Sequence, residues 1–201
     1  PYHSALGVFS GTKSSVREND WAVEHLLALS EHAANLNITL ALEYLNRFES
    51  YLVSCADELI ALVNAVNHSH CKIMLDTFHA NIEEKNISSA IQKMGDQLVH
   101  VQLSENDRGT LGKGHINFRE IMKSLDAIGY IGMISVEAMK CCINNGCEVD
   151  IYSLNDTLDE LIENRIIDFE DMPDGLVADI EVESNNHTFI TSNNFLSSNC
   201  A

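Results

Sequence analysis

The chain repeats one pattern four times: a short apolar run of strand character alternates with a longer segment that carries apolar residues at helical spacing. The strand-like runs occupy residues 38–45, 72–77, 98–104 and 133–139. Helical stripes occupy residues 21–36, 52–66 and 86–94, and Asn117 can cap a further helix that carries Ile121, Leu125 and Ile128. This alternation predicts the α/β class, with a parallel sheet covered by helices.

The composition changes near Lys140. Residues 1–140 hold 17 acidic and 11 basic residues, whereas residues 141–201 hold 13 acidic residues and one base, Arg165. After residue 140 we expect a short helix at 157–163 and β-segments at 165–169, 177–183 and 187–191, with turns at residues 185–186 and 193–194. The change predicts two units, residues 1–140 and 141–201, with a single domain and an acidic tail as the alternative.

Charge and cysteine usage exclude several classes of protein. The net charge is −18, which disfavours nucleic acid as a partner and a basic membrane-binding surface. No apolar run approaches the ~18–20 residues of a membrane span. The six cysteines form neither a disulfide framework nor a zinc-ligand pattern, so we expect free thiols and a cytoplasmic location. Because the chain begins at Pro1, we expect a piece of a longer protein.

Each strand-like run ends in a polar residue that can bind a metal ion or a proton. These residues are Glu43, Asp76, Gln102 and Glu137, separated by 33, 26 and 35 residues. In a barrel the carboxyl ends of the strands meet at one mouth, where three carboxylates would repel one another. A divalent cation relieves that repulsion, and oxygen ligands suit Mg²⁺ or Mn²⁺. The alternative is that each acid lies at the surface beyond its strand.

Five segments resemble the xylose-isomerase-like TIM-barrel family, and within it the ketose 3-epimerases that act on tagatose, psicose and ribulose. The segments read YHSALGVFSG, ALEYLNRFES, IMLDTFHANIEE, VHVQLSENDRGTLGKGHI and SVEAM, within residues 1–139. The resemblance implies the C-terminal half of a (β/α)8 barrel, from about strand four to strand eight. It implies a small-molecule ketose as substrate, a homo-oligomeric full-length protein, and a divalent metal, Mn²⁺ first, with Mg²⁺ or Co²⁺ as alternatives.

The same resemblance implies roles for individual residues. Glu43, Asp76, Gln102 and Glu137 match the metal ligands, and Glu43 and Glu137 also match the two catalytic acid/base groups. Residues that match contacts to substrate oxygens are Glu49, His79 and Arg108.

One position departs from the epimerase pattern. The similar epimerases usually carry His where this chain has Gln102, whereas hydroxypyruvate isomerases carry Gln. An amide oxygen still suits a hard cation, so this position leaves the metal preference open. Residues 46–49, which read NRFE, favour the epimerase branch. The alternatives are a hydroxypyruvate isomerase or other sugar isomerase on the same barrel, and a barrel-type DNA-repair endonuclease, which the negative charge disfavours.

The residue types predict a two-glutamate mechanism. The proton on C3 of a ketose lies next to the carbonyl, and a metal that bridges the C2 and C3 oxygens would stabilise an enediolate. One glutamate removes the proton from one face, and the other returns a proton to the opposite face. Since Glu43 and Glu137 lie on different strands, they can supply the two groups.

Between Ser104 and Ile116 the chain carries three glycines at spacings that match no phosphate-binding loop. We expect a flexible loop beside the active site, with His115 at the surface. On the preceding strand, His100 points the same way as Gln102. It is either a partner of Gln102 or a packed, hydrogen-bonded histidine.

Residues 176–201 resemble the C-terminal splicing motifs of an intein, within an intein-like unit of residues 141–201. Asp179 and His187 match the first block, Asn199 and Cys200 match the splice junction, and Ser198 stands where a histidine usually assists. The Asn199 amide would attack its own backbone carbonyl, and the Cys200 thiol would accept the upstream segment. A splicing element with a passive barrel half, or a β-rich tail without activity, are the alternatives.

Overall fold

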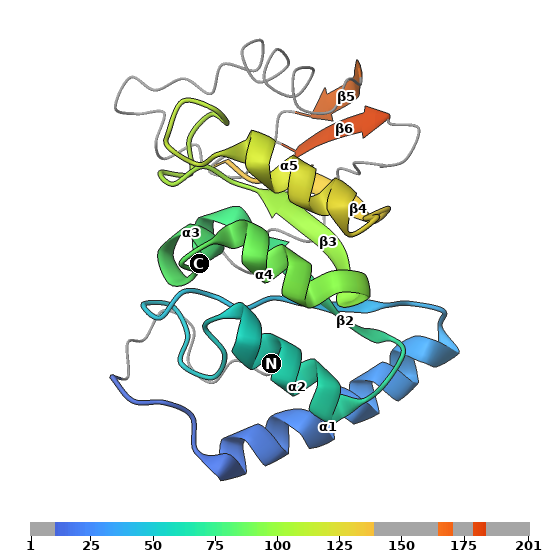
Figure 1. The fold of residues 1–201 in the computed structure, drawn as a ribbon. Coiled ribbons are helices and arrows are strands. Elements are labelled where there is room, and N and C mark those ends of the chain that lie inside the picture. The colour runs from blue at the N-terminus through green and yellow to red at the C-terminus, as the bar shows by residue number, and fades with distance from the viewer. Residues whose placement is uncertain (1–10, 139–164, 171–178, 184–201) are drawn as a thin grey trace. The chain divides into compact units, whose positions relative to one another are not determined.

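The computed structural model describes residues 11–138, 165–170 and 179–183, the last two stretches as backbone alone. The chain divides into two compact units. The first holds the residues up to Leu75 together with His79–Val99, and the second holds Asp76–Phe78 and the residues from His100 onward. Figure 1 traces the elements of both.

The first unit combines a parallel strand pair with helices. β1 (Leu40–Leu42) pairs with β2 (Cys71–Asp76) in parallel, with Leu40 opposite Cys71. The helix α2 (Ala56–Val66) packs against α1 (Val16–Asn35) and against α4 (Ile87–Met94), as Figure 1 shows. The strand and helix types predicted for residues 21–94 are confirmed, and a short 3-10 turn, η1 (Gly95–Gln97), follows α4.

The helix α1 begins five residues before the apolar stripe. Ser15 caps it: the Glu18 N–H donates to Ser15 Oγ (3.3 Å), and the Ser15 N–H donates to Glu18 Oε2 (2.7 Å). Tyr51 adds a hydrogen bond from its hydroxyl to Glu18 Oε1 (2.6 Å). The helix therefore starts at its capping box, although no residue of the first turn is buried.

The second unit repeats the parallel arrangement. β3 (Leu98–Leu103), from His100 onward, pairs with β4 (Met133–Val136), with Gln102 opposite Ser135. Asn117 caps α5 (Phe118–Ala127) by accepting the Glu120 N–H (3.2 Å), as predicted. The core of this unit is formed by fully buried side chains: Val101, Leu103, Leu111, Leu125 and Ile134.

Two strands follow the acidic change in composition. β5 (Arg165–Glu170) and β6 (Asp179–Glu183) form an antiparallel pair, with Phe169 opposite Ile180 and a register shift between Ile166 and Asp168. The strands predicted at 165–169 and 177–183 are thus confirmed within one or two residues. The helix predicted at 157–163, the strand at 187–191 and both Asn-Asn turns lie outside the described residues.

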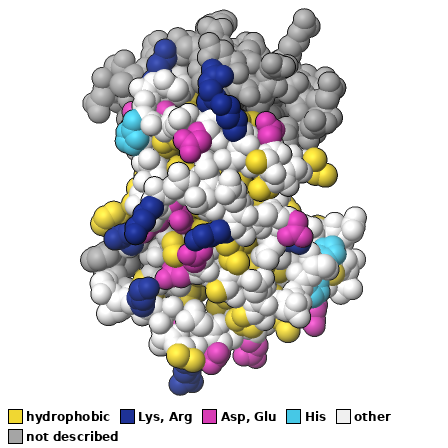
Figure 2. Space-filling view, viewed as in Figure 1, with side chains coloured by type: hydrophobic (Ala, Val, Ile, Leu, Met, Phe, Trp, Pro, Cys, Tyr) yellow, Lys and Arg dark blue, Asp and Glu magenta, His cyan; other side chains and the backbone are white. Residues whose placement is uncertain are grey.

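Surface charge in the described residues is mixed. Figure 2 shows Lys and Arg side chains beside Asp and Glu side chains on the face in view. Lys93 pairs with Asp57 (2.8 Å) in the first unit, where Lys13 pairs with Glu58 (3.3 Å). Among the described helices, none is both long and apolar enough to cross a membrane.

Candidate active site

In the first unit, Glu43 faces a histidine. Glu43 follows β1, and its Oε1 lies 3.7 Å from Nε2 of His79, which is buried in α3 (Thr77–Glu83). His79 Nδ1 accepts the Asn46 N–H (3.1 Å) and the Asn46 side-chain amide (2.9 Å). Because Nδ1 accepts these hydrogen bonds, it carries no proton, and the Nε2–H faces the Glu43 carboxylate.

Asn46 connects three predicted site residues. Its Nδ2 also donates to Glu49 Oε1 (2.7 Å), so Glu49, Asn46, His79 and Glu43 form one polar chain within this unit. Asn46 is 2% exposed, and its Oδ1 accepts the Phe48 N–H (3.0 Å). Sequence reasoning assigned no role to Asn46. The signal was an asparagine directly after the strand-like run of residues 38–45 and three residues before a glutamate. This spacing is typical of a turn closed by a hydrogen bond from the asparagine side chain.

In the second unit, two carboxylates bind the same arginine side chain. Asp76 ends β2, Glu137 follows β4, and both are buried. Nη1 of Arg108 donates to Asp76 Oδ2 (2.8 Å) and to Glu137 Oε2. One positively charged nitrogen reaches both groups, so this pair can share a cation. Carboxylate and amide oxygens, such as those that Asp76, Glu137 and Gln102 carry, are ligand types that suit hard divalent ions.

The electrostatics of this pair raise the pKa of Glu137 to about 7. The first cause is burial, and the second is the charge of Asp76. Arg108 acts in the opposite direction. The raised pKa makes the protonated form of Glu137 more accessible than it is for a solvent-exposed glutamate.

Arg108 is held by several groups in the same unit. Its guanidinium carbon lies 4.1 Å from the centroid of the Phe78 ring, and Nη1 also donates to Ser104 Oγ (3.2 Å). Its backbone has φ 60°, a left-handed conformation that is uncommon outside glycine. The residue is 8% exposed.

Gln102 and His100 share one face of β3. Gln102 is half-buried opposite Ser135, and His100 Nε2 lies 3.1 Å from Ser135 Oγ. Burial lowers the pKa of His100 to about 4, so the ring is neutral at pH 7. These contacts support the packed, hydrogen-bonded histidine among the two interpretations of His100.

The glycine-containing loop is anchored to the side chains of Glu105 and Asn106. Glu105 is fully buried, and Asn106 Oδ1 accepts the N–H of His115 (2.9 Å), whose side chain is exposed as predicted. Sequence reasoning missed both anchoring residues. Their position directly after Ser104, at the strand end and before three glycines, was the available signal.

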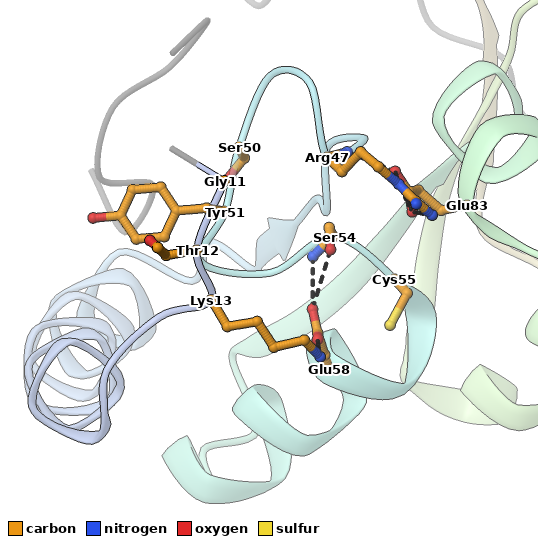
Figure 3. Close-up of a pocket in the computed structure, with 10 residues that line it drawn as sticks. All are labelled: Gly11, Thr12, Lys13, Arg47, Ser50, Tyr51, Ser54, Cys55, Glu58 and Glu83. Carbon is orange, nitrogen blue, oxygen red and sulfur yellow. Dashed lines mark hydrogen bonds and ion pairs between the residues drawn. The ribbon is translucent and has the colours of Figure 1, made fainter. Parts of the chain in front are cut away.

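A separate cavity of about 430 Å³ opens in the first unit. In Figure 3, Ser54 points toward Glu58, which accepts from its N–H (3.0 Å), and Arg47 points toward Glu83 (2.7 Å). None of the predicted site residues lines this cavity, which is formed by Gly11, Thr12, Lys13, Arg47, Ser50, Tyr51, Ser54, Cys55, Glu58 and Glu83. Its charged groups are paired, so the cavity is close to neutral.

The predicted splicing residues are mostly beyond the described chain. Asp179 begins β6, and its backbone pairs with Glu170 of β5. His187, Ser198, Asn199 and Cys200 lie outside the described residues. Of the six cysteines, the two in the described residues, Cys55 and Cys71, are free thiols.

Comparison with known proteins connects this geometry to a family. Residues 3–148 match the family described as xylose isomerase-like TIM barrel. A D-psicose 3-epimerase of Enterocloster bolteae is 44% identical over 116 residues, which are 58% of this chain and 38% of that protein. An L-ribulose 3-epimerase of Methylomonas sp. is 34% identical over 68% of this chain and 47% of its own length.

The solved structures agree with the sequence comparison. D-psicose 3-epimerase with D-tagatose from Clostridium cellulolyticum H10 superimposes with a TM-score of 0.62 at 36% identity, over 67% of this chain and 46% of that one. The chain thus spans less than half the length of these relatives.

Proposed function

Because the chain belongs to the xylose isomerase-like TIM-barrel family, we propose that it supplies part of a metal-dependent enzyme that epimerises a free ketose at C3. The observation that carries this proposal is the buried pair Asp76 and Glu137 at the carboxyl ends of strands, with the pKa of Glu137 raised to about 7. The 44% identity to a D-psicose 3-epimerase supports the choice of a ketose.

The proposed metal ligands are Glu43, Asp76, Gln102 and Glu137, with Mn²⁺ as the first candidate and Mg²⁺ or Co²⁺ as alternatives. When bound, such a cation would stabilise negative charge on the ketose oxygens. Asp76 and Glu137 already share one cationic nitrogen of Arg108, which supports their suitability for a divalent ion.

Glu137 and Glu43 are the proposed proton-transfer groups. Burial and the charge of Asp76 raise the pKa of Glu137, which would help it to accept a proton from C3 and to release one again. Nε2 of His79 lies 3.7 Å from Glu43 Oε1, so that this ring can orient the Glu43 carboxylate. Glu49, His79 and Arg108 are the proposed contacts to hydroxyl and carbonyl oxygens of the substrate.

The test uses this chain combined with the N-terminal half of the Enterocloster bolteae D-psicose 3-epimerase. We expect the combination to interconvert D-fructose and D-psicose in Mn²⁺ and to lose this activity after exhaustive EDTA treatment. Glu137→Gln should reduce turnover by about 10²–10⁴-fold, because the amide cannot accept the proton. Glu120→Gln, on the exposed surface of α5, is the matched control. Undiminished activity in EDTA, or in Glu137→Gln, would refute the proposal.

Gln102 favours a second candidate, a hydroxypyruvate isomerase type of enzyme. The same preparation should be assayed with hydroxypyruvate and with fructose. Faster turnover of hydroxypyruvate than of fructose would favour the hydroxypyruvate isomerase over the ketose epimerase. Turnover of fructose alone would exclude it, and Gln102→His should then retain metal binding.

We further propose that residues 141–201 are related to the C-terminal segment of an intein. Support comes from residues 149–201, which lie beyond the family match, and from the antiparallel pair of β5 and β6; residues 141–148 still fall within that match. The Asn199 side-chain nitrogen would attack the Asn199 carbonyl carbon, form a succinimide and release the amine of Cys200. Mass spectrometry of the incubated chain should then show loss of the last two residues, and Asn199→Ala should prevent that loss. An intact wild-type chain after long incubation would reject this assignment.

A further inference from the structure

The backbone conformation of Arg108 is not explained by the groups that contact its guanidinium. The contacts with Asp76, Ser104, Glu137 and Phe78 involve only the end of the side chain. The backbone at Arg108 is left-handed, with φ 60°. Since a non-glycine residue seldom adopts that conformation unaided, the loop itself must hold it.

Glu105 connects to this loop at four places. Its carboxylate accepts the N–H groups of Asn106 (2.9 Å), Gly112 (3.2 Å) and Ile116 (3.4 Å). Its backbone carbonyl accepts the Arg108 N–H (3.0 Å). Glu105 is 0% exposed, so these hydrogen bonds form away from water. One buried side chain therefore connects the beginning of the loop to its end.

The loop closes tightly over the Glu105 carboxylate. A Cβ placed on Gly114 would lie 2.2 Å from Glu105 Oε2 and 2.1 Å from Asn106 Oδ1. Any side chain at residue 114 must therefore displace these groups. Gly114 leaves Asn106 Oδ1 in place to accept the His115 N–H.

We propose that Glu105 is a positioning residue that holds Arg108 in the active site by binding backbone N–H groups at both ends of the 105–116 loop. The catalytic part of this role rests on the proposed function, in which Arg108 contacts the substrate. The structural part, an Arg108 geometry that depends on Glu105, stands independently of the reaction.

Two variants disturb this arrangement in different ways. Glu105→Gln keeps the size of the side chain but places an NH₂ group where backbone N–H groups already point. Gly114→Ala leaves Glu105 in place and pushes against its carboxylate. Their matched controls are Glu120→Gln, on an exposed surface, and Gly129→Ala, where φ is 66° and an added Cβ meets nothing within 4 Å.

The first readout is NMR of the chain without substrate. In Glu105→Gln and in Gly114→Ala we expect the Arg108 guanidinium signals to shift and the amides of Gly112 and Ile116 to exchange faster with solvent. The control variants should leave both unchanged. Unchanged Arg108 signals and amide exchange in a folded Glu105→Gln chain would overturn the proposal, and Gly114→Ala decides it if Glu105→Gln does not fold.

The second readout is turnover by the chain combined with the N-terminal half of a relative. Glu105→Gln should raise KM for the ketose about tenfold, with a smaller change in kcat. In an Arg108→Met background the same substitution should add little, because it acts through Arg108. Full additivity of the two substitutions would overturn the positioning role. If the NMR changes occur but no preparation turns over a ketose, the proposed function fails while the structural role of Glu105 stands.

Discussion

The buried carboxyl group of Glu137 has a shifted pKa, so its contribution to stability depends on pH. Its carboxyl group is buried and lies near Asp76, which raises its pKa to about 7, while Arg108 favours the charged form. His100, in the same unit, has its pKa lowered to about 4 by burial. The two groups therefore make opposite contributions to the pH dependence of stability.

The sign follows from the protons bound in each state. Between about pH 4.5 and 7, folded Glu137 binds more protons than unfolded Glu137. Its contribution to stability is present below pH 4.5 and is lost as the pH rises through about 7. For His100 the unfolded state binds more protons between about pH 4 and 6.5, so its contribution is lost as the pH falls through about 4.

We therefore predict that Glu137→Gln, without added metal, leaves the contribution of His100 unopposed, so that stability rises more with pH between about pH 5 and 6.5 than it does in the wild type. Urea unfolding at a series of pH values measures this, with Glu120→Gln as the control that keeps the wild-type slope. His100→Gln should have the opposite effect, so that stability falls as the pH rises over the same range. A Glu137→Gln chain with the wild-type pH slope would contradict the raised pKa.

Arg108 carries a second prediction at this scale. Arg108→Met leaves Asp76 and Glu137 buried without their shared cation, so the free energy of unfolding should fall by about 3–5 kcal/mol at pH 8. The loss should be smaller at pH 5, where Glu137 is protonated. Lys93→Met is the matched control, because Lys93 makes an ion pair with Asp57 (2.8 Å) in which both side chains are exposed. Equal losses for both variants would contradict the importance of burial.

At the level of elements, the start of α1 depends on one capping box. The apolar stripe predicted a helix from residue 21, yet the helix begins at Val16 because Ser15 and Glu18 satisfy each other's backbone N–H groups. The pKa of Glu18 is lowered to about 2, first by its hydrogen bond with Ser15 and then by that with Tyr51.

Ser15→Ala should lower the free energy of unfolding by about 1 kcal/mol, as loss of a helix cap usually does. Urea unfolding at pH 7 is the measurement. Ser89→Ala, on an exposed position inside α4, is the control and should cost less. If the two substitutions had the same effect, the cap would not stabilise α1.

At the scale of the whole molecule, the chain aligns with less than half the length of its relatives. The described residues contain four strands in parallel pairing, β1 to β4, whereas a TIM barrel closes with eight. The chain spans 38% of the Enterocloster bolteae D-psicose 3-epimerase and 47% of the Methylomonas L-ribulose 3-epimerase.

We predict that the 201-residue chain alone has no measurable ketose epimerase activity. A sheet that is not closed leaves backbone hydrogen-bonding groups and apolar surface without partners, and it lacks the substrate contacts of the other strands. Addition of the N-terminal half of a relative should restore turnover of fructose. Turnover of fructose by the chain alone would contradict this prediction.

Local chemistry explains which parts of the fold the sequence predicted. The four strands that pair in parallel and the helices α1, α2, α4 and α5 follow from apolar spacing, and the Asn117 cap follows from residue type. The helix α3 was not predicted, because it directly follows β2 without a turn between them and is only seven residues long. Strand ends were less well predicted, since β1 spans three residues where the apolar run spans eight.

By itself, the sequence determined which polar residues lie at or near the carboxyl end of each strand, and so the candidate ligands Glu43, Asp76, Gln102 and Glu137. Only the tertiary structure placed Arg108 between Asp76 and Glu137, which lie 32 and 29 residues away along the chain. The tertiary structure also produces the burial that raises the pKa of Glu137. The physical reason is that periodicity is a property of neighbouring residues. Burial, shared hydrogen bonds and electrostatic coupling depend on which distant side chains meet.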